Sequence, residues 1–235
     1  MMTPAPSADL HLLQQQNQAL ETQSPQEVLR FALTAYFPHI VLASSFGAED
    51  VALIDMLSRI NAAVPILYLD TDFLFAETYA TRDALVKRYG IAPIQVKSLL
   101  TPEQQAAQFG DKLWERQPDE CCNQRKVEPL ARALKPYKAW ITGIRREQSA
   151  RRATAKIIEW DSQFELVKFN PLARWTNEDV WTYIKLYDVP YNPLHDQGYP
   201  SLGCTYCTRA VQPGEDSRAG RWAGFAKTEC GLHPK

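Results

Sequence analysis

The chain has 235 residues, of which 45% are hydrophobic and 23% charged, and this is the composition of an ordinary globular protein. Its formal net charge of -1 argues against a general binder of nucleic acid or of anionic membranes, because neither would attract a neutral protein. No apolar run approaches the roughly 18–20 residues of a membrane span, and the N-terminus lacks signal-peptide features. The sequence therefore predicts a cytoplasmic protein whose five cysteines stay reduced.

The composition changes twice along the chain. Residues 1–24 are polar and rich in glutamine, and we expect a loosely held helix or arm there. Ser24-Pro25 then has the pattern of a helix N-cap followed by proline at the first helical position. Residues 25–190 are expected to form an α/β domain. Residues 191–235 are interrupted by proline and glycine, which predicts an irregular C-terminal tail that closes over the same site.

Short apolar runs alternate with helical stretches in the first part of the domain. The runs of buried-strand type lie at residues 40–43, 64–69, 94–96 and 139–142. This alternation predicts βαβ units and hence a mostly parallel twisted sheet with helices on both faces. Ligands of such sheets bind beyond the carboxyl ends of the strands. We therefore expect three segments that each follow a strand, residues 44–50, 70–72 and 143–152, to meet at one crevice.

Four of the cysteines form two pairs. Cys121 and Cys122 are adjacent, and Cys204 and Cys207 form a C-x-x-C motif. Four thiolates suit either Zn²⁺ or a [4Fe–4S] cluster. Adjacent side chains diverge and reach two corners of a tetrahedral site poorly, whereas a wider cluster accepts them more readily. The pattern favours iron–sulfur over zinc, and incidental buried thiols are the third interpretation.

The fifth cysteine, Cys230, stands alone in the tail. A lone cysteine near a terminus is more often a spectator than a nucleophile. Lys227 and His233 flank it, however, and nearby positive charge lowers the pKa of a thiol and yields thiolate.

Arginines are concentrated in two places. Arg145, Arg146, Arg151 and Arg152 fall within eight positions just after the strand at 139–142, and Arg218 and Arg221 lie in the tail. Such a run is often only a solvated face. Its position after a strand instead points it at the predicted crevice, where arginine could grip phosphate or sulfate oxygens with two hydrogen bonds.

These features together resemble the assimilatory adenylylsulfate (APS) reductases, the iron–sulfur branch of the APS/PAPS (sulfonucleotide) reductase family. The double cysteine, the C-x-x-C motif and the final E-C-G-L-H occur in the family's order. The segments that carry the resemblance are residues 44–50, 69–71, 121–130, 142–152, 171–181, 198–209, 213–222 and 229–233. One position departs from the family pattern, because Asp72 stands where the family has glycine.

The resemblance implies an adenine nucleotide alpha-hydrolase-like fold, so that residues 25–190 would bind nucleotide. It implies reduction of adenosine 5′-phosphosulfate to sulfite and AMP by thioredoxin or a similar dithiol protein, in sulfate assimilation and cysteine biosynthesis. Cys230 would carry an S-sulfocysteine intermediate. The implied cofactor is a [4Fe–4S] cluster on Cys121, Cys122, Cys204 and Cys207.

The resemblance also implies roles for other residues. Lys126 and His233 would assist Cys230 in catalysis, with Lys126 placed between cluster and substrate. The implied substrate-binding residues are Ser44, Ser45, Phe46, Gly47, Leu69, Asp70, Gly143, Arg145, Arg152, Arg218 and Arg221. In contrast, Trp175, Trp181 and Tyr183 fit the packing face of a helix and are expected in the core.

Several alternatives stay open on the sequence. The nearest is activity on the 3′-phosphorylated substrate PAPS. More distant ones are an ATP-dependent adenylating enzyme of the same fold and a non-enzymatic metal-binding or redox-sensing module. No nucleic acid or membrane partner is expected, and a homo-oligomer is compatible with the sequence.

Overall fold

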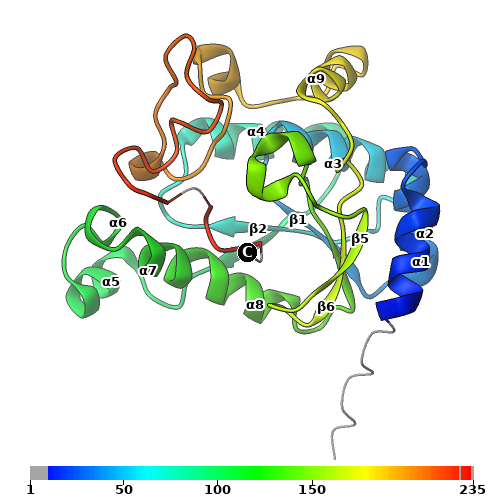
Figure 1. Cartoon of the computed structure of the whole chain (residues 1–235). Helices are drawn as coiled ribbons and strands as arrows, with labels where there is room; N and C mark the ends of the chain where they lie inside the picture. The colour runs from blue at the N-terminus through cyan, green and yellow to red at the C-terminus, as the bar shows by residue number, and fades with distance from the viewer. Residues whose placement is uncertain (1–9, 228, 234–235) are drawn as a thin grey trace, which may run out of the picture.

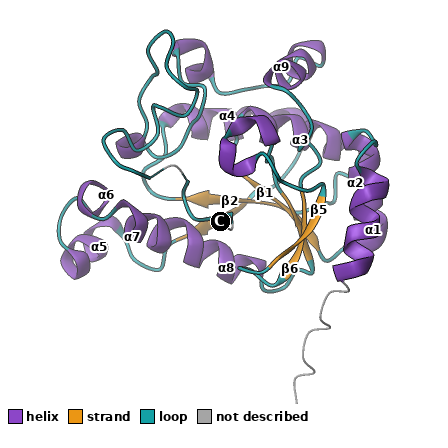
Figure 2. Cartoon of the chain, in the orientation of Figure 1, coloured by secondary structure: helices purple, strands orange, loops and turns teal. Residues whose placement is uncertain are grey.

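The computed structural model describes residues 10–227 and 229–233. A six-stranded sheet in the order β3-β2-β1-β4-β6-β5 forms its centre (Figure 2). All neighbouring strands are parallel except β5 and β6, which form an antiparallel pair. The strands are β1 (Ile40–Ser44), β2 (Ile66–Asp70), β3 (Ile94–Lys97), β4 (Ala139–Ile141), β5 (Ile158–Asp161) and β6 (Leu166–Phe169).

The strand β1 is the pivot of this topology. Leu42 of β1 pairs with Ile66 of β2 on one side and with Ile141 of β4 on the other. The chain builds β2 and β3 outward from one edge of β1 and then returns to build β4 and β6 from the other. This change of direction makes a switch point between β1 and β4, which is where open parallel sheets bind ligands.

Helices cover both faces of the sheet (Figure 1). Five helices share one large hydrophobic cluster with the residues of one sheet face. They are α1 (Leu10–Leu20), α2 (Pro25–Tyr36), α3 (Ala48–Ile60), α4 (Ala76–Tyr89) and α9 (Asn177–Leu186). A smaller cluster on the opposite face includes α8 (Glu128–Leu134). The helices α5 (Pro102–Phe109), α6 (Leu113–Arg116) and α7 (Pro118–Cys122) lead into α8.

Alternation along the strands explains why two cores form. In β1, Ile40 and Leu42 belong to the larger cluster and Val41 to the smaller one. In β4, Trp140 likewise points to the smaller cluster, opposite to Ile141. Because both faces are apolar, each must be covered, and the predicted α/β fold with helices on both faces is confirmed.

Two features near the ends of the domain differ from the sequence-based expectation. The β5–β6 hairpin was not predicted. The described part of the N-terminal arm, from residue 10 on, is a helix that packs rather than hangs loosely. Leu13 and Leu20 of α1 are buried, and the Asn17 side chain accepts the Ile157 N–H at 2.8 Å. Helix α1 thus covers the outer strand β5.

Other local predictions are confirmed, with one exception. Ser24 caps α2 through a reciprocal hydrogen-bonded pair with Glu27, and Pro25 follows it. Tyr183 is buried in α9 and donates a hydrogen bond to Asp55, while Trp181 of the same helix packs against the larger core. Trp175 also packs there but lies just before α9, so its expected place on a helix face is wrong.

After α9 the described residues contain only short 3₁₀ turns and isolated bridges, as expected for an irregular tail. Two of these turns span Pro193–Gln197 and Thr205–Cys207. The chain then returns across the sheet, so that its last described residues lie over the smaller core (Figure 1). Among the described helices, none has the length and apolar character needed to cross a membrane.

Candidate active site

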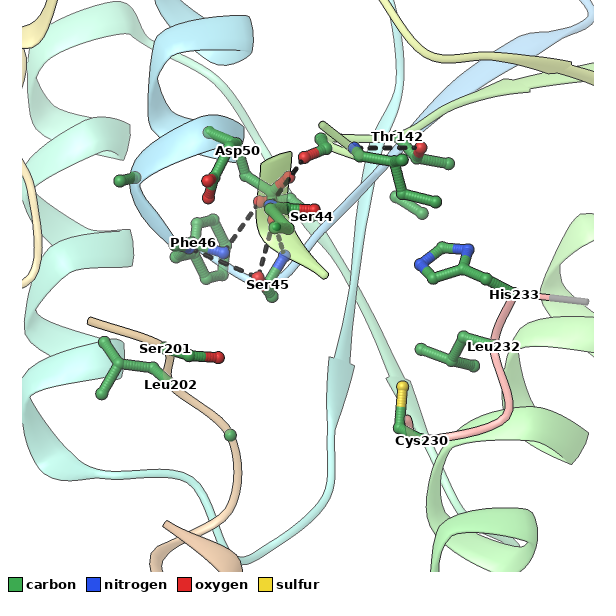
Figure 3. Close-up of a pocket in the computed structure, with 18 of the residues that line it drawn as sticks. Ser44, Ser45, Phe46, Asp50, Thr142, Ser201, Leu202, Cys230, Leu232 and His233 are labelled. Atoms are coloured by element: carbon green, nitrogen blue, oxygen red, sulfur yellow. Dashed lines mark hydrogen bonds between the residues drawn. The ribbon is translucent and has the colours of Figure 1, made fainter. Parts of the chain in front are cut away.

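A cavity of about 430 Å³ lies beyond the carboxyl ends of β1 and β4 (Figure 3). The β1–α3 loop and the loop after β4 line it, as expected from the strand order. Of the predicted residues 70–72, however, Thr71 alone lines the cavity. The C-terminal segment completes the wall through Ser201, Arg218, Arg221, Cys230 and His233, among others.

Most of the predicted substrate-binding residues meet at this cavity, with one difference. Ser44, Ser45, Phe46, Gly47, Leu69, Gly143, Arg145, Arg152, Arg218 and Arg221 all line it. Asp70 does not. Its carboxylate accepts hydrogen bonds from the Tyr79 hydroxyl at 2.7 Å and from the Asp72 N–H at 3.0 Å, so it holds the start of the next loop instead.

The β1–α3 loop is held by its own side chains. The Ser44 hydroxyl accepts the Phe46 N–H at 3.0 Å, and Asp50 accepts both the N–H and the hydroxyl of Ser45. Phe46 has a φ of 58°, and its ring packs against Tyr68 at 5.3 Å between centroids. The bulky ring is therefore in the core, although Phe46 also belongs to the lining of the cavity.

Gly143 allows the loop after β4 to approach α3 closely. A Cβ at this position would lie 2.4 Å from Asp50 Oδ1 and 2.8 Å from the Glu49 Cβ. No other residue fits there without moving α3. The same close packing buries Asp50, which raises its pKa to about 6 against the lowering effect of the hydrogen bonds from Ser45.

Arg145 is buried in the cavity wall between two carboxylates. Its Nε donates to Glu49 at 2.8 Å and its Nη1 to Glu147 at 3.0 Å. Arg146 instead pairs with Glu21 outside the cavity lining. Of this arginine run, Arg145 and Arg152 therefore border the cavity.

Arg152 meets a carboxylate from the tail. Its Nε and Nη2 donate to the two oxygens of Glu229 at 2.9 and 2.7 Å. Arg218 donates to the same carboxylate at 3.2 Å, and so does the Ser149 hydroxyl. Two of the predicted substrate-binding arginines, Arg152 and Arg218, thus form ion pairs with the same carboxylate.

Arg221 is fixed by the segment before Cys204. Its Nη1 donates to the Leu202 carbonyl at 2.9 Å and to the Ser201 hydroxyl at 3.1 Å. The guanidinium lies 4.5 Å from the centre of the Trp222 ring. A Cβ on Gly203 would come within 2.3 Å of this arginine, so a glycine is needed for Arg221 to reach the cavity.

The four paired cysteines line a second, smaller cavity. Cys121, Cys122, Cys204 and Cys207 share it with Phe73, Trp114, Arg125, Lys126 and Tyr206. The loop after β2 brings the pairs together. The Thr71 hydroxyl lies 3.3 Å from the Cys204 sulfur, and Arg125, shortly after Cys122, donates to the Thr71 carbonyl at 3.2 Å.

Asp72 adopts the backbone conformation for which the family has glycine at this position. Its φ of 60° lies in the left-handed region that glycine adopts readily and that aspartate tolerates. Its carboxylate pairs with the buried Arg125 at 2.9 Å and with Lys97. The substitution therefore keeps the turn and supplies a counter-charge to a buried arginine.

Lys126 lies between the two cavities and lines both. It belongs to a π-helical turn, Asn123–Val127, that begins directly after Cys122. Burial alone would lower the pKa of its ammonium, but the Cys204, Cys122 and Cys230 thiols lie near enough to raise it. The lysine is thus the one group in contact with both sites within the described ranges 10–227 and 229–233.

Cys230 points into the large cavity from the tail (Figure 3). His233 follows it, with its ring stacked on Trp140 at 5.8 Å between centroids. Burial, with positive charge nearby from Lys168, Arg152 and Arg218, lowers the pKa of His233. In the described part of the chain, the His233 ring stacks on Trp140 and no hydrogen bond joins it to Cys230. The catalytic role predicted for His233 therefore stays a prediction.

Residues 39–210 match the family model for the phosphoadenosine phosphosulfate reductase domain. The chain belongs to this family. It is 52% identical over 218 residues to a protein of Shouchella clausii named adenosine 5′-phosphosulfate reductase, covering 92% of this chain and 90% of that one. It is 47% identical over 233 residues to a phosphoadenosine 5′-phosphosulfate reductase of Gloeobacter violaceus, covering 98% and 97% of the two chains.

A solved structure of the family has the same fold. The phosphoadenylyl-sulfate reductase from Candida auris, in a phosphate complex, superposes with a TM-score of 0.78 at 32% identity. The match covers 87% of this chain and 100% of the Candida chain. The resemblance inferred from the sequence motifs is therefore confirmed at the level of the reductase family.

Sequence reasoning missed two contributors to this reductase-family site. Glu229 belongs to the E-C-G-L-H motif and Ser201 to the segment 198–209, but the sequence pattern assigned neither a role. One signal in the sequence could have drawn attention to Glu229: a carboxylate next to the predicted nucleophile is unexpected, because it opposes the positive charge that the chemistry needs. Its role becomes clear only from its partners Arg152 and Arg218, which are distant in the sequence.

The buried Asp50 predicts a pH effect on stability. An unfolded aspartate ionises near pH 4, whereas folded Asp50 holds its proton to about pH 6. This raised pKa stabilises the folded state at low pH, and the contribution is lost as the pH rises through 6. Relative to Asp50→Asn, the parent's free energy of unfolding should fall by on the order of 1 kcal/mol between pH 5 and 7.

Urea unfolding of the parent and Asp50→Asn at both pH values measures the difference. A difference that is constant with pH, or that grows in the opposite direction, would contradict the buried carboxyl assigned here.

Proposed function

We propose that the protein reduces adenosine 5′-phosphosulfate to sulfite and AMP, with electrons from thioredoxin or a similar dithiol protein. The observation that carries the proposal is the position of Cys230, which lines the same cavity as Lys126, Arg218 and Arg221. A nucleophilic thiol beside clustered cations suits an anionic sulfur electrophile. Relatives named adenosine 5′-phosphosulfate reductase, at up to 52% identity, support this substrate.

The proposed reaction has two steps, attack by Cys230 and release of sulfite by the dithiol. The Cys230 thiolate attacks the sulfate sulfur, the bond from sulfur to the bridging oxygen breaks, and AMP leaves with the electron pair. Cys230 then carries a Cys–S–SO₃⁻ group. One thiol of the reductant attacks the Cys230 sulfur, displaces sulfite and forms a mixed disulfide with Cys230. The second thiol attacks the reductant's own sulfur in that bond, releases Cys230 as the thiolate and closes the reductant's disulfide. The dithiol is oxidised by two electrons and the sulfur is reduced by two.

Positive charge must offset the approach of one anion to another. Lys126 is buried at the wall of the cavity, and Arg221 is held there by the Ser201 hydroxyl and the Leu202 carbonyl. Fixed cations in a partly desolvated site stabilise developing negative charge more than mobile surface cations do. We propose that Lys126, Arg218 and Arg221 bind the phosphosulfate, and that the Ser44–Gly47 and Gly143 backbone lies along the nucleotide.

The four paired cysteines fit a [4Fe–4S] cluster. They line one cavity, and burial together with the neighbouring thiols raises the pKa of Cys121 to about 12 and of Cys207 to about 11. Such thiols become ligands when a cationic centre draws off their protons. The adjacent pair Cys121 and Cys122 supports a cluster over zinc, because adjacent side chains reach two corners of a tetrahedral zinc site poorly.

The cluster, when bound, would organise the site and tune the electrostatic field around the sulfate. The two electrons of the reaction come from thiols. The residues of this chain that act on the substrate are the lysine, the arginines and Cys230.

The second candidate is reduction of the 3′-phosphorylated substrate. It is favoured by the name of the Gloeobacter violaceus relative and by that of the Candida auris structure. The adenylating enzyme considered from the sequence has only a fold match behind it, at 16% identity to an FMN adenylyltransferase of Candida glabrata. The redox sensor stays an alternative from the sequence. The cytoplasmic location and any homo-oligomer remain predictions.

Sulfite release separates the two substrates. Anaerobically purified protein with thioredoxin, thioredoxin reductase and NADPH should release sulfite from APS, with a kcat/KM higher than for PAPS. Cys230→Ser should lower turnover by roughly a thousandfold or more, because a serine hydroxyl is too basic to attack unaided. It should still bind AMP in a calorimetric titration. Faster turnover of PAPS would reverse the assignment, and a fully active serine variant would remove Cys230 from the mechanism.

Iron content tests the cofactor. Protein made without oxygen should contain about four irons per chain and absorb broadly near roughly 400 nm, as a [4Fe–4S] cluster does. Replacement of Cys121, Cys122, Cys204 or Cys207 by serine should remove this absorption. Cys230→Ser is the matched control, because it changes a thiol outside the set and should leave the iron in place. Stoichiometric zinc without iron would refute the cluster.

A further inference from the structure

The last described residues are held on both sides of Cys230. Before it, Glu229 bonds to Arg152, and after it, the Gly231 carbonyl accepts the Gln163 side chain at 2.8 Å. Leu232 packs against the smaller core, and His233 stacks on Trp140. The thiol is thus placed by its neighbours in the chain (Figure 3).

The Glu229 contact anchors this tail by an ion pair, in addition to the Gly231 hydrogen bond. Its carboxylate is 11% exposed and the Arg152 side chain 13%, so the pair is largely withdrawn from water. Both carboxylate oxygens are used, at 2.9 Å from Nε and 2.7 Å from Nη2. Paired donors in this geometry are stronger and more directional than a single hydrogen bond. Ser149, three residues before Arg152, bonds to the same carboxylate at 3.2 Å.

All three guanidinium nitrogens of Arg152 already donate hydrogen bonds within the chain. Two of its nitrogens face Glu229, and the third, Nη1, donates to Gln148. A sulfate bound by Arg152 would have to displace Glu229, and this would release the residue next to the nucleophile. Binding the sulfate and holding the tail are therefore competing uses of the same guanidinium.

We propose that Arg152 and Ser149 form the docking site for Glu229 and that this contact holds Cys230 in the cavity. Arg152 is then a positioning residue that acts through the tail and does not bind the sulfate. The functional meaning of this docking rests on the proposed reductase reaction. The thiol would be docked for attack on the substrate, and undocking of Glu229 would expose the sulfonated Cys230 to the dithiol reductant.

Alkylation of Cys230 reports the docking directly and needs no substrate. Anaerobic holoprotein is treated with iodoacetamide, quenched at intervals and digested with trypsin, and the peptide that follows Lys227 is quantified by mass spectrometry. The variants are Glu229→Gln, Arg152→Ala and the double variant. Glu215→Gln is the matched control, because Glu215 bonds to Arg209 with both oxygens at 2.8 and 2.9 Å but lies exposed.

Each single variant should alkylate Cys230 about tenfold faster than the parent, because either one removes a partly buried charge pair. The double variant should be no more than about twofold faster than the faster single variant, since both changes break one contact. Glu215→Gln should match the parent. Where Arg152→Ala fails to retain iron, Arg152→Lys replaces it, since it keeps the charge but loses the two-oxygen contact.

Kinetics provide the second measurement. A positioning role predicts that Glu229→Gln and Arg152→Ala lower kcat by similar factors and change KM for APS by less than about threefold. The docking proposal would be overturned if either single variant alkylated Cys230 at the parent's rate. It would also be overturned if the two single-variant rate increases multiplied in the double variant, or if Glu215→Gln raised the rate as much as they do. If the protein failed to reduce APS, the alkylation result would still stand, so the two proposals fail separately.

Discussion

Lys126 is a buried cation that lines both cavities, and it is the physical link between them in the described part of the chain. A charge withdrawn from water is tolerated only when other charged or polar groups surround it. Here those groups are thiols on two sides, Cys122 and Cys204 from one cavity and Cys230 from the other. The same lysine therefore links the cysteine set to the nucleophile. A cluster bound by the cysteines and an anion bound in the large cavity would both be attracted to this one ammonium group.

The fold brings these partners together because β1 and β2 are neighbouring parallel strands of the sheet. Strand β1 ends in the loop that lines the large cavity, and β2 ends in the loop whose Thr71 contacts Cys204. Because neighbouring parallel strands end at the same edge, the two cavities share a wall. The irregular C-terminal segment can then contribute to both, first with Cys204 and Cys207 and later with Cys230. Its lack of regular structure allows it to follow this path.

Sequence reasoning succeeded where the physical rule is local or periodic. Apolar runs bounded by turn residues identified the first four strands, and their alternation with helices predicted a mostly parallel sheet. It failed at Asp70, because a carboxylate at a strand end can turn toward the ligand or toward a neighbour such as Tyr79, and the pattern is the same. The β5–β6 hairpin was missed since Glu165 and Lys168 interrupt its apolar pattern. Lys168 is nevertheless buried beside Glu159.

The roles of the arginines depended on contacts that spacing does not reveal. Arg145 and Glu49 are 96 positions apart, and Arg152 and Glu229 are 77 apart. The motif predicted correctly that these arginines border the cavity, but not that carboxylates of the same chain hold them. A charge cluster in a sequence thus indicates an anion site without identifying the anion. In this protein one such anion is Glu229, a residue of the tail itself.

The covalent state of Cys230 tests the central claim most directly. When the anaerobic parent protein is mixed with APS and no reductant, the intermediate has no thiol to release it. The tail peptide should therefore gain about 80 Da, the mass of one sulfonate, and should lose it again when thioredoxin is added. A tail peptide that keeps its original mass while AMP is formed, or a sulfonate on any other cysteine, would contradict the account.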